Sequence, residues 1–421
     1  IIPRGGAAWG AAAAGRAGAG LPPEDGERLV ARLREGACEL GFAALGVARV
    51  EPFPEAEAAM RQRLAAGKLA GLPWFDAARA HRACHPEARF PWARSLVVAA
   101  ASYAHAVAPA AGRRVGRVAR YTWGRDYHRA LADGLRALAA TLDGLVGRPL
   151  RAAVLVDTSA LAEREAARRA GLGWFGKHSG LLSPGGSWTL LGTLVTEADL
   201  PPDRPLRKTC GSCTRCLVAC PTGALRLDAP YELDNARCIS YLTIEHRGPI
   251  PRELRPLIGD WLFGCDICQE VCPVNRRPPG ASLAALAADA GVGPALDPAE
   301  LLGLDESAFR ARFRHTPLWR PRRRGLLRNA CVVLGNVGDA AAVPALARAL
   351  SDAEPLVRGH AAWALGRIGG PAATAALAAR LAAEPDAWVR EELAEALAET
   401  RAGASLEHGP ATLALRTSAE P

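Results

Sequence analysis

The arrangement of the cysteines constrains this chain more than any other feature of its sequence. The chain has 421 residues and 11 cysteines, and eight of these cysteines lie within residues 210–272. The first four are Cys210, Cys213, Cys216 and Cys220, and Pro221 follows them. This C-x2-C-x2-C-x3-C-P spacing lets three thiolates bind three corners of one cubane iron–sulfur cluster, while the fourth thiolate points to a different cluster. The first run therefore predicts a second one.

A second run, which lacks one cysteine, stands downstream. Its members are Cys265, Cys268 and Cys272, followed by Pro273, and Cys238 is available as the missing thiolate. Exchange of the fourth ligand assigns Cys210, Cys213, Cys216 and Cys272 to one cluster, and Cys220, Cys238, Cys265 and Cys268 to the other. All eight thiols are then used, so we expect two 4Fe–4S clusters on a ferredoxin-type segment. Two all-thiolate zinc sites are the alternative, but zinc needs neither the C-x3-C-P continuation nor an exchanged ligand.

The other three cysteines, and the odd total, argue against a disulfide scaffold. A secreted scaffold normally spreads an even number of cysteines over a short chain. Cys38, Cys84 and Cys331 lie outside both runs and are expected to be ordinary buried thiols.

Charge and composition permit a nucleic-acid partner and argue against a membrane. The net charge is +9, which allows a polyanionic partner without requiring one. No stretch of about 18 consecutive apolar residues is present, so we expect no membrane association. The start of the sequence lacks the basic, apolar and small-residue order of a secretory signal, so the cytoplasm is the expected compartment. Residues 1–25, mostly Gly, Ala and Pro, are expected to form a disordered leader.

The region ahead of the cysteines has the patterns of a mixed α/β domain. Helical periodicity marks residues 26–40 and 127–146, and apolar strand patterns mark residues 95–101, 152–156 and 188–195. Because iron–sulfur clusters transfer electrons and do no bond chemistry themselves, we expect the reaction site in this upstream region.

Asp157 is the candidate catalytic residue of this region. It follows the strand pattern 152–156 directly, and a helix that contains Glu163 comes after it. One interpretation is a helix N-cap, which contributes roughly 1 kcal/mol. The other is a functional carboxyl, because the C-terminal ends of strands hold ligands and catalytic groups in α/β folds. In an apolar pocket, such a carboxyl would have a raised pKa and act as a proton donor.

A glycine-rich loop follows that helix. Residues 170–179 contain three glycines, which permit left-handed turns and close backbone approach to a flat or phosphate-bearing ligand. Lys177 and His178 end the loop and would be ordinary solvated residues in the absence of a ligand. The loop supports a cofactor site without identifying the cofactor.

Several blocks of the sequence, in their order along the chain, resemble the epoxyqueuosine reductase family. They are Arg120 to His128, Val156-Asp157-Thr158 with Glu163-Arg164, Ala170 to His178, Gly186-Ser187-Trp188, Cys238 to Thr243 and Gly264 to Asn275. The resemblance covers most of residues 26–400. One segment departs from the family's usual Arg, acidic residue and Pro, and no contact is assigned there: Arg82-Ala83-Cys84-His85-Pro86.

The resemblance implies a fold and a reaction. The fold is an α/β cobalamin-binding domain, a two-cluster ferredoxin-type domain and a C-terminal α-helical HEAT-like repeat, which we place at residues 26–200, 201–280 and 281–421. The reaction is reduction of epoxyqueuosine to queuosine at the wobble position of tRNA. Electrons pass from an unidentified donor through two 4Fe–4S clusters to cobalamin, while Asp157 protonates the epoxide oxygen. We expect the enzyme to be a monomer.

The candidate contacts to cobalamin or substrate come from the same resemblance. They are Lys177, His178, Leu181, Ser187, Gly192 and Ser240.

The C-terminal region combines an internal repeat with an arginine-rich run. Leu334-Gly335 recurs as Leu365-Gly366, and Val357-Arg358 recurs as Val389-Arg390, as expected for short HEAT-like helix pairs that bind partners. The run ahead of the repeat is either a solvated face or a set of phosphate contacts to a folded RNA. Its clustering and the bidentate grip of arginine on phosphate favour RNA. The candidate tRNA contacts are Arg320, Arg322, Arg323, Arg324 and Arg328.

Three other functions fit parts of the sequence. A plain electron carrier would need only the cysteine runs, and the large upstream domain argues against it. A corrinoid reductive dehalogenase also joins cobalamin to two clusters, but that family usually has a twin-arginine signal, absent here, and lacks the repeat tail. A tRNA-binding structural module with vestigial clusters would not need all eight cysteines.

Overall fold

The computed structural model describes residues 23–105, 115–158, 160–277 and 280–401. The expected leader lies almost entirely outside these residues, as does the end of the expected C-terminal domain after residue 401. Within the described ranges, no helix is long and apolar enough to cross a membrane. The expected domain bounds at residues 200 and 280 stay predictions.

An antiparallel four-stranded sheet forms the centre of the first half of the chain. Its order is β1-β2-β7-β4, with β1 at Ala44–Arg49, β2 at Ser95–Ser102, β7 at Thr189–Thr196 and β4 at Ala152–Leu155. The three strand patterns of the sequence agree with β2, β4 and β7 to within one residue, while β1 has no counterpart among them. All residues of β2 are buried, because this strand has neighbours on both sides and both faces of the sheet are covered.

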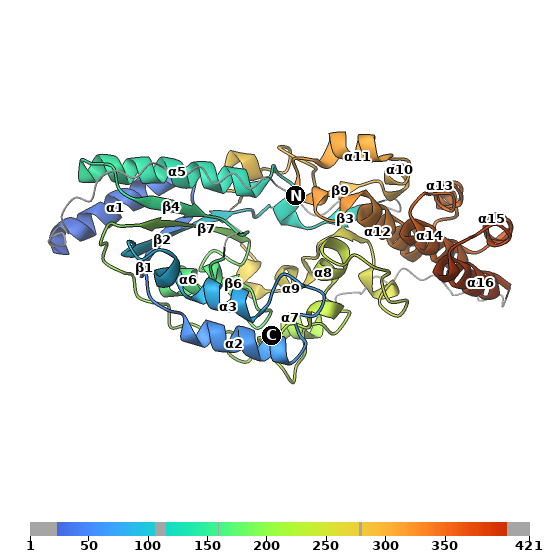
Figure 1. The fold of residues 1–421 in the computed structure, drawn as a ribbon, viewed down its shortest axis with the longest axis horizontal. Helices are drawn as coiled ribbons and strands as arrows, with labels where there is room; N and C mark the ends of the chain where they lie inside the picture. The colour runs from blue at the N-terminus through green and yellow to red at the C-terminus, as the bar shows by residue number, and fades with distance from the viewer. Residues whose placement is uncertain (1–22, 106–114, 159, 278–279, 402–421) are drawn as a thin grey trace.

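Helices cover the two faces of this sheet (Figure 1). Helices α1 (Pro23–Glu39) and α5 (Tyr127–Val146) lie on one face, and α6 (Glu163–Arg169), α3 (Ala77–Cys84) and α2 (Pro54–Ala65) lie on the other side. Helix α5 has the limits that the periodicity predicts.

The packing of each face follows from the alternation of side chains along a strand. Four leucines of α5 recur at helical spacing, and all four are buried in the core that contains Val97 of β2 and Leu194 of β7. They are Leu131, Leu135, Leu138 and Leu142. The neighbouring residues Val98 and Val195 point to the opposite face and pack with α6 and with Cys84 of α3. The short helix α4 (Pro86–Arg89) follows α3, and a hairpin of β5 (Trp174–Phe175) and β6 (Leu181–Leu182) follows α6.

The cysteine-rich segment consists of short helices and loops. Its helices are α7 (Arg215–Val218), α8 (Ile239–Ile244) and α9 (Ile267–Glu270). A three-stranded sheet ties the segment to both neighbours, because β3 (Gly116–Val118) pairs with β8 (Trp261–Phe263) on one side and β9 (Ala295–Leu296) on the other. Segments far apart in the sequence therefore share one set of backbone hydrogen bonds.

The C-terminal part is helical and extends to one end of the molecule (Figure 1). Its helices are α10 (Pro298–Leu301), α11 (Glu306–Phe313), α12 (Arg322–Val337), α13 (Val343–Ala349), α14 (Pro355–Ile368), α15 (Pro371–Leu381) and α16 (Ala387–Arg401).

The repeated glycines lie where helices α12, α14 and α16 approach one another most closely. A β-carbon at Gly335 would lie 2.9 Å from the α-carbon of Ala364, and one at Gly366 would lie 2.8 Å from the α-carbon of Ala396. Real β-carbons do not come so close to backbone atoms, so any larger residue would push the helices apart. The Leu-Gly repeat of the sequence therefore marks helix contacts.

Candidate active site

Asp157 lies where the chain leaves strand β4, and its backbone has an uncommon conformation. Its φ angle is 46°, in the left-handed region that non-glycine residues rarely adopt. Its side chain is 49% exposed. One carboxylate oxygen, Oδ2, accepts a hydrogen bond of 2.8 Å from the hydroxyl of Tyr127 and lies 3.0 Å from Nε2 of His128. Backbone strain of this kind is common at functional sites, where surrounding contacts hold it in place.

His128 connects Asp157 to a second carboxylate. Its Nδ1 lies 2.7 Å from Oδ1 of Asp126, the N-cap residue of α5, which also accepts the backbone N–H of His128. Burial lowers the pKa of His128, but the hydrogen bonds to Asp126 and Asp157 outweigh it and raise that pKa to about 9. The ring therefore carries a proton on both nitrogens at neutral pH.

The expected raised pKa of Asp157 is wrong. Burial does raise it, but the hydrogen bonds from His128 and Tyr127 hold the pKa of Asp157 below its usual value. The N-cap interpretation is also wrong, because α6 begins at Glu163 and its N-cap residue is Ala162. Asp157 is thus an ionised carboxylate that accepts hydrogen bonds from Tyr127 and His128.

The raised pKa belongs to Glu163 instead. Burial and the neighbouring charge of Asp157 raise the pKa of the Glu163 carboxyl to about 7. Its Oε2 accepts the backbone N–H of Asp157 at 3.3 Å. The sequence placed Glu163 next to the site, but its role depends on burial that only the folded chain supplies. The site thus holds two groups that can store a proton beside Asp157, namely His128 and Glu163.

The site borders the cysteine-rich segment. Tyr121 is partly buried, and its pKa is raised by this burial and by the carboxylates of Asp157 and Asp266 together. Asp266 stands between two cluster cysteines, and its Oδ2 accepts the backbone N–H of Arg120 at 2.7 Å. Tyr103 of the upstream region donates a hydrogen bond of 3.3 Å to Gln269 of α9.

The eight cysteines fall into two neighbouring sets. Burial raises the pKa of the Cys216 thiol to about 11, and the thiols of Cys210, Cys272 and Cys213 add to this shift. Burial likewise raises the pKa of Cys265, with Cys268 and Cys238 as thiol neighbours, and Cys220 acts on Cys238 in the same way. These are the sets that the exchanged topology assigns, and the binding of one cluster by each set stays a prediction. Among the other thiols, Cys84 and Cys331 are buried, but Cys38 is exposed, so the expectation of burial is wrong there.

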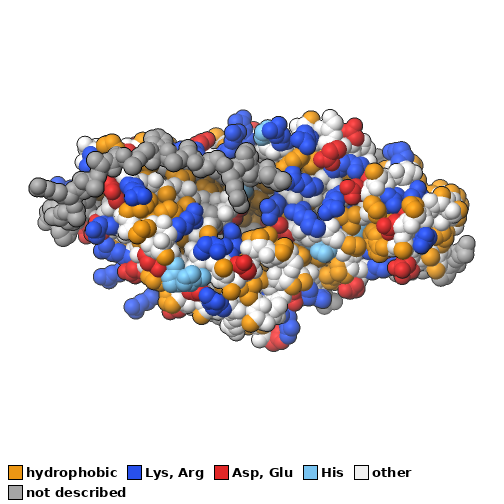
Figure 2. Space-filling model, viewed as in Figure 1, with side chains coloured by type: hydrophobic (Ala, Val, Ile, Leu, Met, Phe, Trp, Pro, Cys, Tyr) orange, Lys and Arg blue, Asp and Glu red, His pale blue; other side chains and the backbone are white. Residues whose placement is uncertain are grey.

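Arg320 brings the C-terminal region close to Asp157. Its positive charge contributes to the low pKa of Asp157, and its guanidinium donates to both oxygens of Glu245, at 2.8 and 2.9 Å. Arg322 and Arg324 are exposed. Lys and Arg side chains gather on this face over α8 and α12 (Figure 2). A predicted catalytic residue and a predicted tRNA contact are thus neighbours.

Two of the candidate tRNA contacts are at least half-buried and bind other parts of the chain. Arg328 is completely buried, and its guanidinium donates to the backbone carbonyls of Leu242, His246 and Gly248 and to Asn329. It cannot reach a phosphate without unfolding, so the prediction for Arg328 is wrong. Arg323 is half-buried and binds the carboxylate of Asp352.

The sequence and the fold are similar to those of known proteins. Residues 83–158 match the family described as epoxyqueuosine reductase QueG, DUF1730. Residues 209–275 match the 4Fe-4S double cluster binding domain, and residues 323–398 match HEAT repeats. The epoxyqueuosine reductase of Xanthomonas campestris pv. campestris is 38% identical over 357 residues, which cover 83% of this chain and 99% of that protein. The chain belongs to the epoxyqueuosine reductase family.

Two further relatives agree with this assignment. The epoxyqueuosine reductase of Bacillus subtilis (strain 168) is 34% identical over 390 residues, 91% of this chain and 98% of the relative. A crystal structure of an epoxyqueuosine reductase with an epoxyqueuosine-modified stem loop of tRNA-Tyr superposes with a TM-score of 0.81 and 32% identity, over 89% of this chain and all of that one. This epoxyqueuosine reductase family member is an oxidoreductase with a 4Fe–4S double-cluster domain and HEAT repeats.

The six candidate cofactor contacts of this family member lie in different surroundings. The backbone N–H of Lys177 donates to Sγ of Cys210 at 3.4 Å, and its Nζ donates to the carbonyl of Gly211. Ser187 is buried and bonded to Gln269 and Asn275. The backbone N–H of Ser240 donates to the Cys238 thiol. Leu181 is buried, and Gly192 lies inside β7 with Leu135 of α5 against its α-carbon.

His178 has the feature expected of a residue that binds an absent polar group. Its side chain is 7% exposed, and its Nε2 has no hydrogen-bond partner. The same holds for Nε1 of Trp174 and Oγ1 of Thr193. Buried polar atoms are nearly always hydrogen-bonded, so these atoms on β5, on β7 and on the loop after β5 are each candidates to bind a polar group.

Proposed function

We propose that this chain reduces epoxyqueuosine in tRNA to queuosine, with electrons delivered through its two 4Fe–4S clusters and with cobalamin as cofactor. The observation that carries the proposal is the half-exposed carboxylate of Asp157, held by Tyr127 and by the protonated ring of His128. The relatives named above supply the substrate class.

The reaction needs two electrons and two protons. Both carbon–oxygen bonds of the epoxide break, the two carbons become joined by a double bond, and the oxygen leaves as water. The proton on Nε2 of His128 can pass to Oδ2 of Asp157 and from there to the substrate oxygen, since the two atoms are 3.0 Å apart. Glu163, with a pKa of about 7, can hold the second proton.

Cobalamin fits the residues around the glycine-rich loop. When bound, it supplies a cobalt centre that takes up electrons singly and acts on the epoxide. His178, Trp174 and Thr193 would hold it with their unpaired polar atoms. Lys177 and Ser240, whose backbones contact cluster cysteines, would lie between the cofactor and the clusters, while Leu181, Ser187 and Gly192 would support the walls of the site.

The exposed arginines fit the backbone of the tRNA. Arg320, Arg322 and Arg324 can offer guanidinium groups to phosphates, and Arg320 lies close enough to Asp157 to affect its charge. We infer further that the chain acts as a cytoplasmic monomer, takes electrons from an unidentified donor, and has domain bounds near residues 200 and 280.

The test is anaerobic purification with cobalamin added, followed by iron and cobalt quantification and an assay for epoxide loss in tRNA nucleosides. About eight irons and one cobalt per chain, with loss of the epoxide, are expected for two four-iron clusters and one corrinoid. About eight irons with neither cobalt nor turnover would reduce the chain to an electron carrier.

A further inference from the structure

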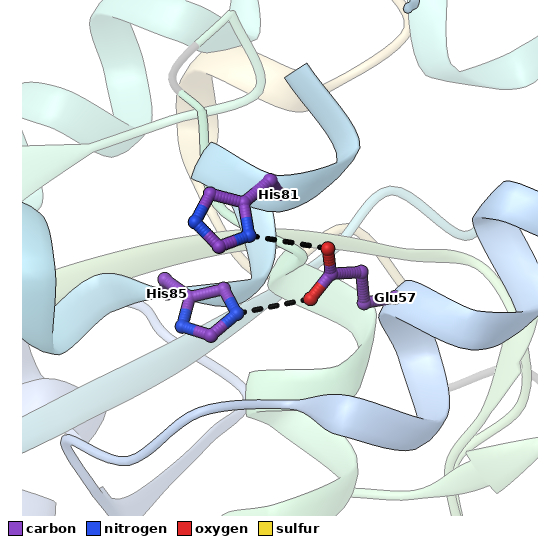
Figure 3. Close-up of side chains that lie close together, drawn as sticks. All are labelled: Glu57, His81 and His85. Carbon is purple, nitrogen blue, oxygen red and sulfur yellow. Dashed lines mark hydrogen bonds and ion pairs between the residues drawn. The ribbon is translucent and has the colours of Figure 1, made fainter. Parts of the chain in front are cut away.

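Two histidines and a glutamate meet on the side of helices α2 and α3, apart from the site just described. Figure 3 shows their side chains pointing toward one another: Glu57 from α2, His81 from α3 and His85 directly after α3. Nδ1 of His81 lies 3.1 Å from Oε1 of Glu57, and Nε2 of His85 lies 2.9 Å from Oε2 of the same carboxylate. Histidine side chains also stand out on this face in the space-filling view (Figure 2). The proposed reaction uses none of these groups.

The three side chains match a known metal-ligand set. Each residue offers one nitrogen or oxygen atom, and these atoms lie within 4.8 Å of one another. Zinc binds histidine nitrogen and carboxylate oxygen at about 2.0–2.2 Å, which puts neighbouring atoms of a tetrahedral site about 3.3 Å apart. The separations of 2.9 and 3.1 Å run to different oxygens of Glu57. Because the three ligand atoms lie within 4.8 Å of one another, the side chains need to close up by at most about 1.5 Å to bind one ion. The side chain of His81 is 53% exposed, so an ion can enter from solvent.

Hydrogen bonds from neighbouring side chains orient these residues. Nδ1 of His85 lies 2.8 Å from Oε1 of Glu87, which leaves Nε2 directed at Glu57. Arg61 donates two hydrogen bonds, of 2.9 and 2.7 Å, to Oε1 of Glu57. The other oxygen of Glu87 is buried and has no hydrogen-bond partner. Metal-binding histidines nearly always bond a carboxylate or carbonyl through their second nitrogen, and metal-binding carboxylates are hydrogen-bonded in turn.

We propose that Glu57, His81 and His85 form a binding site for a divalent transition-metal ion, with zinc as the preferred occupant. Two imidazoles and one carboxylate suit zinc and leave a fourth position for water. The ion would join α2 to the end of α3. There, the carbonyl of Ala83 accepts the backbone N–H of Ala162, in the segment that leads from Asp157 to α6. The expected role is therefore to stabilise the wall behind the active site.

The alternative is an ion-pair cluster that needs no metal, because protonated histidines would also be attracted to Glu57 and Glu87. Zinc retention distinguishes the two. The protein must carry its iron–sulfur clusters during the test, since free cysteines also bind zinc. One equivalent of zinc is added anaerobically, the protein is desalted, and zinc and iron are quantified together.

The informative variants are His81→Ala, which removes an exposed side chain, and Glu57→Gln, which keeps the volume but removes the charge. His315→Ala is the matched control, because His315 is exposed and lies far from α3 in the sequence. We expect one zinc per chain in the parent and the control, at least tenfold weaker retention in both variants, and unchanged iron in all four proteins. Zinc should also raise the melting temperatures of the parent and the control, and it should leave those of the two variants unchanged. Equal zinc retention and equal melting shifts in His81→Ala, or no zinc in the parent, would overturn the proposal.

Discussion

Nε2 of His128 lies 3.0 Å from Oδ2 of Asp157, and the opposite nitrogen of the same ring lies 2.7 Å from Asp126. One imidazole thus stands between two carboxylates. Although burial opposes it, this arrangement raises the pKa of His128 from 6.5 to about 9. The folded protein therefore keeps a proton that the unfolded chain loses near pH 6.5. The stabilisation from this contact is complete below about pH 6.5 and disappears as the pH rises through about 9.

The first prediction is an alkaline limit on turnover. If the proton on His128 reaches the substrate through Asp157, kcat for epoxide loss should fall as the pH rises through about 9. The variant His128→Gln should lose activity by roughly 10²–10⁴-fold, and its kcat should show no fall near pH 9. The measurement is a pH–rate profile of both proteins with saturating reductant. If kcat of the variant still falls near pH 9, the proton belongs to another group.

The second prediction concerns Asp157 itself. Asp157→Ala should reduce turnover by at least about 10²-fold, while iron and cobalt contents stay at the level of the parent, because this exposed side chain has no part in the cores. The matched control is Asp133→Ala, which removes a 74% exposed carboxylate from α5. Full activity of Asp157→Ala would remove this residue from the mechanism.

Much of the architecture was predictable from the sequence because it depends on local patterns. The limits of α5 follow from leucines at helical spacing, and the central strands follow from short apolar runs. The two cysteine sets follow from a ligand spacing that iron–sulfur clusters impose. Strand β1 was missed because its sequence, Ala-Leu-Gly-Val-Ala-Arg, contains a glycine and two alanines, which are depleted in strands.

The chemistry of the site was less predictable because it depends on long-range packing. The sequence marks the block around Tyr127 and His128 and the block around Asp157, but only the strand order brings the start of α5 to the end of β4. The lowered pKa of Asp157 follows from that contact, and the raised pKa of Glu163 follows from its burial and from the charge of Asp157. Arg328 was wrongly placed because a run of arginines does not reveal which member faces the interior.

The third prediction separates surface arginines from buried ones. Replacing Arg322 and Arg324 together with Ala should weaken tRNA binding and reduce the salt dependence of log K by about 1–2, since each phosphate contact releases about one counterion. The measurement is a binding titration at several salt concentrations. The control removes two exposed arginines distant in sequence, Arg32 and Arg136. An unchanged salt dependence of log K would show that the arginine run is a solvated face without phosphate contacts.

Arg328→Ala should behave differently from that double variant. It removes the Arg328 donor from the buried carbonyl of Leu242 and from the partly buried carbonyls of His246 and Gly248. The expected cost is of order 3 kcal/mol or more, with a lower melting temperature. Weak tRNA binding by a fully stable Arg328→Ala protein would contradict the structural role.

The last prediction tests the exchange of cluster ligands. Cys220 belongs to the first cysteine run by sequence but neighbours Cys238 of the second set in the fold, and Cys272 neighbours Cys210 of the first. Cys220→Ala should therefore damage the cluster of Cys238, Cys265 and Cys268, and Cys272→Ala should damage the other. Each variant should retain about four irons. The remaining cluster differs between the two variants, so their electron paramagnetic resonance signals should differ as well. Cys38→Ala, which removes an exposed thiol outside both sets, should keep about eight. If Cys220→Ala instead shares the spectrum of Cys213→Ala, the ligands follow the sequence order and the exchange is absent.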